Sequence, residues 1–200
     1  MQLGNHVSPT SGVFLVVLSQ WNEQSNTTSL YNAQVQLSVP KWSKPVSPCV
    51  KINIDAAVGF DHIGGVGGVL RDTAETFLGG WCNQCDWSTS ISSLEAMANR
   101  EALVLLKAWG YQHIVLEGDS QSIIHQLNSP RSNMSYEGLI INDILALSKE
   151  FTYVSFSWVP REANKVAHQL VALVKTTTGC NVWWDDPPTI LVNNLLIDSQ

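Results

Sequence analysis

Three acidic residues lie at positions from which a folded chain could gather them into one site. Asp55 ends an alternating apolar and polar stretch, Glu95 lies near the start of an amphipathic stretch, and Asp119 follows a short apolar one. In an α/β fold, strand ends and helix starts converge on the same region. Three carboxylates held together repel one another unless cations share them, and Mg²⁺ prefers oxygen ligands and binds phosphate. These residues are therefore candidates for a magnesium site that engages phosphate.

Each acid also has a purely structural explanation. Asp55 could simply be a strand-end residue that enters a turn, and Asp119 could be the N-cap of a following helix. Glu95 could complete a capping box with Ser92, which would stabilise the helix start by about 1 kcal/mol. Metal binding is compatible with all three explanations, so both interpretations stay open.

The cysteines do not form a recognisable zinc motif. Cys82 and Cys85 make a single C-x-x-C pair. A structural zinc site needs four ligands, usually from two such pairs or from a pair and two histidines. The sequence therefore favours two free thiols in a loop.

The first elements that must position the acids are strands. Residues 50–55 alternate between apolar and polar types, which predicts a half-buried strand. The ranges 66–71 and 76–81 predict two more strands, so the three would form an antiparallel meander. Glycines between residues 59 and 68 indicate turns and close backbone approaches.

Helices and strands then alternate. A helix begins near Ser92, where the capping box would lie, and ends at Gly110. The remaining elements are a buried strand at 113–117, helices at 120–127 and 135–149, a strand at 153–159 and a helix at 164–174. The order β-β-β-α-β-α-α-β-α predicts an α/β fold, with a mixed five-stranded sheet and helices packed on it.

The chain divides into one domain and two flanking segments. Residues 1–40 form a polar extension of unclear structure, and prolines punctuate the linker that follows. The domain spans residues 41–178. We expect residues 179–200 to be a C-terminal tail that wraps the surface.

Composition and charge narrow the function classes. A hydrophobic fraction of 44% and a charged fraction of 14% argue against a disordered chain. The net charge of −6 argues against tight, nonspecific binding of nucleic acid, so affinity must come from a local patch or from bridging metal ions. No stretch approaches the ~20 apolar residues of a membrane span, and the short run at 12–18 makes a poor signal peptide. We expect an intracellular monomer that does not enter membranes.

Five short motifs in order resemble those of the plant reverse-transcriptase-associated ribonuclease H-like family. The motifs are INIDAA at 52–57, GGVGGVLRD at 64–72, LEA at 94–96, LEGDS at 116–120 and VPREANKVAHQL at 159–170. The upstream KWSKP at 41–45 resembles the segment that leads into that domain. The resemblance therefore covers residues 41–174 and implies the ribonuclease H-like fold.

The resemblance also implies an activity. Members hydrolyse the RNA strand of RNA–DNA hybrids with two Mg²⁺ or Mn²⁺ ions. Carried over, Asp55 would bridge both ions, and Glu95 and Asp119 would complete the shell of one. For nucleic-acid contacts, Arg161 and Asn164 are candidates, as are Gly64 and Gly65, whose backbone could approach 2′-hydroxyls.

The sequence departs from active members at one catalytic position. Members carry a fourth carboxylate where this chain has His168, and imidazole is a poor ligand for Mg²⁺. The loop before Asn164 also lacks a histidine, and Gly118 replaces a serine. Three functions therefore stay open: a hybrid-cleaving nuclease with His168 in the catalytic set, a weakened or inactive nucleic-acid-binding domain derived from a retroelement, and a protein-interaction module.

Overall fold

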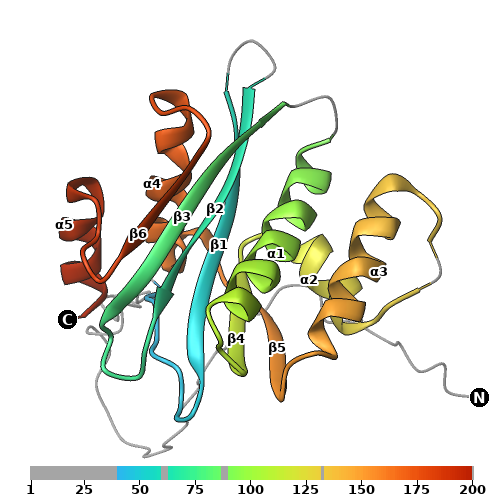
Figure 1. The fold of residues 1–200 in the computed structure, drawn as a ribbon, viewed down its shortest axis with the longest axis horizontal. Coiled ribbons are helices and arrows are strands. Elements are labelled where there is room, and N and C mark those ends of the chain that lie inside the picture. The colour runs from blue at the N-terminus through green and yellow to red at the C-terminus, as the bar shows by residue number, and fades with distance from the viewer. Residues whose placement is uncertain (1–39, 60–62, 87–89, 132, 200) are drawn as a thin grey trace, which may run out of the picture. The chain divides into compact units, whose positions relative to one another are not determined.

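Six strands form one mixed sheet in the computed structural model, which describes residues 40–59, 63–86, 90–131 and 133–199 (Figure 1). The sheet has the order β5-β4-β1-β2-β3-β6. Its strands are β1 (Val50–Val58), β2 (Ile63–Arg71), β3 (Phe77–Asp86), β4 (His113–Gly118), β5 (Tyr153–Trp158) and β6 (Cys180–Trp184). The extension expected at residues 1–40 lies, apart from Pro40, outside the described residues.

The meander predicted from the glycine-rich region is present. β1, β2 and β3 pair antiparallel, whereas β4 pairs parallel to β1 and β5 parallel to β4. In the parallel pair, Asn53 is opposite Glu117 and Ile54 is opposite Gly118. Asp55 and Asp119 each follow the last of these pairs, so the register brings the two acids to the same edge of the sheet.

Helices cover both faces of the sheet (Figure 1). On one face α1 packs against β1 and β2, with α2 and α3 beside it, while α4 covers the other face and α5 packs on α4. The helices are α1 (Ile91–Ala108), α2 (Gln121–Asn128), α3 (Tyr136–Ser148), α4 (Lys165–Ala172) and α5 (Thr189–Asp198). None of the helices in the described ranges is long and apolar enough to span a membrane.

The alternation in β1 predicted a half-buried strand with one solvent-exposed face, and this detail is wrong. Ile52 and Ile54 are buried in the cluster beneath α1, but the polar residues Lys51, Asn53 and Asp55 are buried as well. The reason is that α4 covers the second face. A polar strand face is therefore enclosed in the protein and must find its partners there.

The start of α1 also differs from the prediction. Ser90 is the N-cap, and its side-chain oxygen accepts a hydrogen bond from the backbone N–H of Ser93 at 3.2 Å. The expected capping box between Ser92 and Glu95 is therefore wrong, because the helix begins earlier. Glu95 lies beyond the cap, where its carboxylate is free for another role. The helix ends as predicted at Gly110, whose φ is +83°.

The segment after residue 178 contributes a strand and a helix. β6 pairs antiparallel with β3 at the sheet edge, and Leu191 of α5 is fully buried. The sheet thus has six strands instead of the expected five, and residues 180–184 and 189–198 are part of the fold, not a surface tail. β6 has the sequence CNVWW, in which four of the five residues are apolar, so it lacks the alternation of apolar and polar types that predicts a half-buried strand.

Candidate metal centre

The three acids predicted from the sequence meet in space. Asp55, Glu95 and Asp119 each offer one carboxylate oxygen, and these oxygens all lie within 4.8 Å of one another. Glu95 comes from the second turn of α1 and Asp119 from the residue after β4. Asp55 lies within β1, which continues to Val58, so the prediction that Asp55 ends its strand is wrong. The predicted convergence of the three acids is confirmed.

Burial and mutual repulsion act strongly on these carboxylates. Only 3% of Asp55 and 9% of Glu95 is exposed, and Asp119 is half-buried. Desolvation, followed by the charges of Asp55 and Asp119, raises the pKa of Glu95 to about 9. Desolvation and Asp119 also raise the pKa of Asp55, against the hydrogen bond from His168. Without a cation, the set of three carboxyl groups therefore retains a proton at neutral pH, on Glu95.

The donor set fits a hard divalent cation. All three ligands are carboxylate oxygens, which suit Mg²⁺ and Mn²⁺ better than softer metals. The buried Oε2 of Glu95 has no hydrogen-bond partner within the described structure. A buried carboxylate oxygen without a partner is costly, and a bound cation would satisfy it.

His168 and Arg161 form a chain that ends on Asp55. The Nδ1 of His168 lies 2.7 Å from Oδ2 of Asp55, and Nη2 of Arg161 lies 2.9 Å from Nε2 of His168. Arginine can only donate, so the consistent tautomer has Nε2 accepting from Arg161 and Nδ1–H donating to Asp55. The His168 side chain is 42% exposed. Two more residues predicted from the sequence therefore adjoin the acids.

Asn164 faces the interior, not the surface. It is 1% exposed, its Nδ2 donates to the backbone oxygen of Ile54 at 2.8 Å, and its Oδ1 accepts from Asn53 at 3.3 Å. Both ends of the amide are thus used inside the fold. This placement favours a role in joining the start of α4 to β1.

Gly64 and Gly65 are buried in β2. A Cβ atom at Gly65 would lie 2.6 Å from Cγ2 of Val174, closer than real side chains approach. The close approach of the segment after α4 thus explains Gly65 through packing. A contact of these two glycines with nucleic acid remains a prediction.

Sequence reasoning missed a group of polar residues beside the acids. We call it the buried polar cluster. Its members are Trp42, Lys51, Asn53, Arg71, Glu117, Asn164 and Asp198, which hydrogen bonds and ion pairs connect. The one available signal was the polar alternation at Lys51 and Asn53, on a strand whose two faces are both covered.

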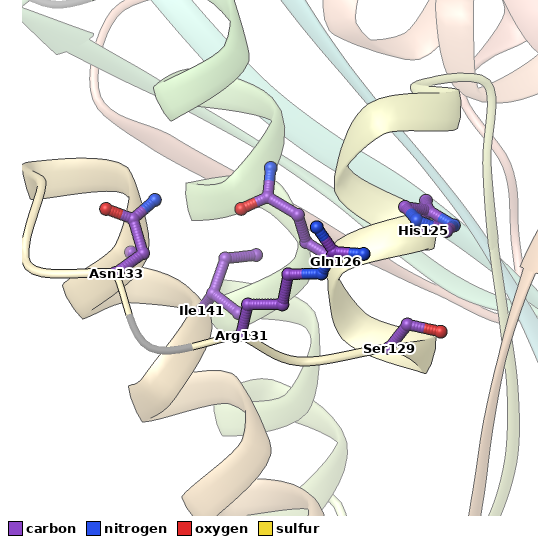
Figure 2. Close-up of a pocket in the computed structure, with 7 residues that line it drawn as sticks. His125, Gln126, Ser129, Arg131, Asn133 and Ile141 are labelled. Atoms are coloured by element: carbon purple, nitrogen blue, oxygen red, sulfur yellow. The ribbon is translucent and has the colours of Figure 1, made fainter.

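A separate pocket of about 380 Å³ lies between α2 and α3 (Figure 2). His125 and Gln126 belong to α2, whereas Arg131 and Asn133 lie on the connection to α3. None of the three acids lines it. The pocket is polar and has a cationic side chain, but it is not part of the metal centre.

Comparison with known proteins gives a family and a fold. Residues 53–174, more than half of the chain, match the family described as reverse transcriptase-like. No curated protein sequence matches the chain. The fold is similar to that of RNase H1 from the halophilic archaeon Halobacterium salinarum, with 22% identity, a TM-score of 0.59, and coverage of 64% of this chain and 98% of that one.

Two further structures are similar. For the N-terminal RNase H domain of a Mycobacterium tuberculosis protein, identity is 20% and the TM-score is 0.58, covering 64% of this chain and 94% of that one. For LC11-RNase H1 in complex with an RNA/DNA hybrid, identity is 21% and the TM-score is 0.56, covering 62% and 94%. At these identities the likeness establishes the α/β ribonuclease H-like fold and nothing finer.

Proposed function

Because the chain belongs to the reverse transcriptase-like family and has a ribonuclease H-like fold, we propose that it cleaves the RNA strand of RNA–DNA hybrids in a metal-dependent reaction. The observation that carries this proposal is the convergence of Asp55, Glu95 and Asp119 within 4.8 Å. One structural neighbour was crystallised with an RNA/DNA hybrid, which supports this class of substrate.

Asp55, Glu95 and Asp119 would hold the two Mg²⁺ or Mn²⁺ ions of the proposed site. Divalent cations supply Lewis-acid stabilisation of phosphate charge and a more acidic bound water. Glu95 gives up its proton when the site is loaded, because the carboxylate is the ligand form. Asp119 is only half-buried, so solvent reaches the group at this residue, and we propose that a phosphodiester approaches it there.

Arg161 is proposed to orient the nucleic acid. Its side chain is exposed and reaches His168 next to Asp55, so a guanidinium lies at the edge of the acidic group. Guanidinium groups bind phosphate through charge-assisted hydrogen bonds. The net charge of −6 means that the overall electrostatic field of the chain does not attract phosphate, so binding of nucleic acid depends on local cations such as Arg161.

The contact of His168 with Asp55 supports a second candidate function, a weakened or inactive nucleic-acid-binding domain. Oδ2 of Asp55 already accepts a hydrogen bond from the imidazole, so this oxygen is less available to a cation. If the imidazole were released from Arg161 or Asp55 to bind a cation, its nitrogen would favour Mn²⁺ over Mg²⁺. We therefore expect slow cleavage, faster with Mn²⁺ than with Mg²⁺.

The test is cleavage of an end-labelled RNA–DNA hybrid in Mg²⁺ and in Mn²⁺. The wild-type chain should nick the RNA strand, and Asp55→Asn should abolish the activity. Asp143→Asn makes the same acid-to-amide change on exposed α3 and should cleave normally. If the wild type cleaves with neither metal but still shifts the hybrid on a gel at low salt, the binding domain replaces the nuclease.

A further inference from the structure

The side chain of Asn53 makes every hydrogen bond that an amide can make. Its Oδ1 accepts from Nε1 of Trp42 at 2.7 Å and from Nη2 of Arg71 at 3.1 Å. Its Nδ2 donates to Oε2 of Glu117 at 3.1 Å and to Oδ1 of Asn164 at 3.3 Å. An amide has two lone pairs and two N–H groups, so its capacity is filled. The residue is fully buried, and its four partners come from four separate segments of the chain.

Asn53 connects the two strands that lead to Asp55 and Asp119. It is the register partner of Glu117 across β1 and β4. Asp55 and Asp119 follow these two residues by two positions each. A shift of β1 against β4 at this pair would therefore change the separation of the two acids.

A third connection leads to α4. Asn164, held by Asn53, donates to the backbone oxygen of Ile54, next to Asp55. The backbone oxygen of Asn164 accepts from the N–H of His168 at 3.0 Å in the first turn of α4. Through Asn164, the side-chain amide of Asn53 therefore fixes the start of α4, the helix that carries His168.

The surrounding charges are balanced and buried. Lys51 pairs with Glu117 at 2.6 Å, and Arg71 pairs with Asp198 at 2.8 Å, while the ring of Trp42 lies 3.6 Å from the guanidinium carbon of Arg71. Buried ion pairs add little net stability over well-packed apolar residues, because desolvation offsets their attraction. What they supply is orientation, since a buried charge that leaves its partner is uncompensated.

We propose that Asn53 is a positioning residue for the metal centre: its four hydrogen bonds fix β1 against β4 and α4, and so set the spacing of Asp55, Asp119 and His168. The inference rests on the proposed metal site. A role in packing alone would require only that the space be filled. A positioning role requires the hydrogen bonds themselves, and metal affinity should then depend on them.

The experiment measures Mn²⁺ binding to the full chain by calorimetry, at a temperature where circular dichroism shows each variant folded. Asn53→Leu removes all four hydrogen bonds without adding charge, and it should weaken Mn²⁺ binding about 10- to 100-fold, as the loss of groups that orient metal ligands does. The double variant Asn53→Asp with Glu117→Gln keeps the net charge and reverses the hydrogen bond between the two positions, so that residue 117 donates and residue 53 accepts. It keeps the acceptor for Trp42 and Arg71 but loses the donation to Asn164, so it should bind Mn²⁺ more tightly than Asn53→Leu and less tightly than the wild type.

Leu103→Ala is the control, because Leu103 is fully buried in the hydrophobic cluster beneath α1 and is neither an acid of the metal centre nor a member of the buried polar cluster. Its Mn²⁺ affinity should equal that of the wild type despite lower stability. Wild-type affinity in Asn53→Leu, or an equal loss in Leu103→Ala, would overturn the positioning role.

Two further outcomes remain decisive. If Asn53→Leu does not fold, Trp42→Phe replaces it, since this change deletes only the indole donor and keeps a ring over Arg71. Trp42→Phe should still weaken Mn²⁺ binding measurably, and unchanged affinity would refute the inference. If the wild type binds no Mn²⁺, the metal site itself fails, a result distinct from binding that is insensitive to residue 53.

Discussion

The imidazole Nδ1 of His168 lies 2.7 Å from Oδ2 of Asp55, the carboxylate to which the family resemblance gives the central place among the metal ligands. This contact joins α4 to β1. It also gives Asp55 a hydrogen-bond donor at the position where the family resemblance implies a fourth acid. The metal preference and the rate of the protein should therefore depend on residue 168.

His168→Asp should raise the rate of hybrid cleavage in Mg²⁺ by at least about tenfold, because a carboxylate is the better ligand for this ion. The rate ratio between Mn²⁺ and Mg²⁺ should fall in the same variant. Single-turnover cleavage assays in each metal measure both effects. His168→Asn serves as the control, since it removes the imidazole without adding an acid. If His168→Asn raises the cleavage rate as much as His168→Asp does, the cause is the loss of the hydrogen bond to Asp55 and not the added carboxylate.

Metal binding should release protons near neutral pH. The pKa of Glu95 is raised to about 9, so this carboxyl is protonated at pH 7 and must ionise to become a ligand. Protons compete with the ion below that pKa, so affinity should increase as pH rises from 7 towards 9 and level off above it. Calorimetry in two buffers of different ionisation enthalpy should detect about one proton released at pH 7. A heat that is identical in both buffers would contradict the prediction.

Gly65→Ala should destabilise the protein by about 1–3 kcal/mol through overpacking, because its Cβ would overlap the side chain of Val174. Urea unfolding followed by circular dichroism measures the change. Gly118→Ala is the matched control, since its Cβ would meet Ile54 at an ordinary 3.4 Å. Adding Val174→Ala to Gly65→Ala should recover part of the loss. If both glycine variants lose the same stability, steric overlap is not the reason for the glycine at 65.

Trp42→Ala should lower the free energy of unfolding by about 3–5 kcal/mol, the usual cost of truncating a large buried aromatic residue. The indole is buried, donates to Asn53 and covers the Arg71 guanidinium. Val46→Ala lies in the same segment at an exposed position and should change stability by less than about 0.5 kcal/mol. Equal midpoints of urea unfolding for the two variants would show that the segment does not belong to the folded unit.

Much of the site could be predicted because its signals are local. Asp55 and Asp119 directly follow apolar strand patterns, and the register of parallel neighbours then brings such residues together. The ends of α1 depended on weaker local signals, and Ser90 competed successfully with Ser92 for the N-cap. In the sequence, Ser90 and Ser92 are equally good candidates for the N-cap, and tertiary packing selects between them.

The buried polar cluster could not be predicted, because its partners lie far apart along the chain. Asn53 joins Trp42, Glu117 and Asn164, and nothing in the spacing of these residues indicates that they meet. The polar alternation of β1 indicates a solvated face unless the helix that covers it is known. The strand β6 was missed for a related reason, since it is short, its sequence CNVWW does not alternate, and its partner β3 lies far away along the chain.

The outer partners of the Asn53 network, Trp42 and Asp198, both lie outside the segment 53–174 that defines the family match. A recombinant fragment limited to that segment would lack Trp42 and Asp198. The loss of Trp42 would leave a cavity beside Asn53, and the loss of Asp198 would remove the counterion of Arg71. Such a fragment could lose metal affinity while retaining every acidic ligand. Domain boundaries chosen by homology would then mimic an inactivating mutation, so fragments of this protein should include both Trp42 and Asp198.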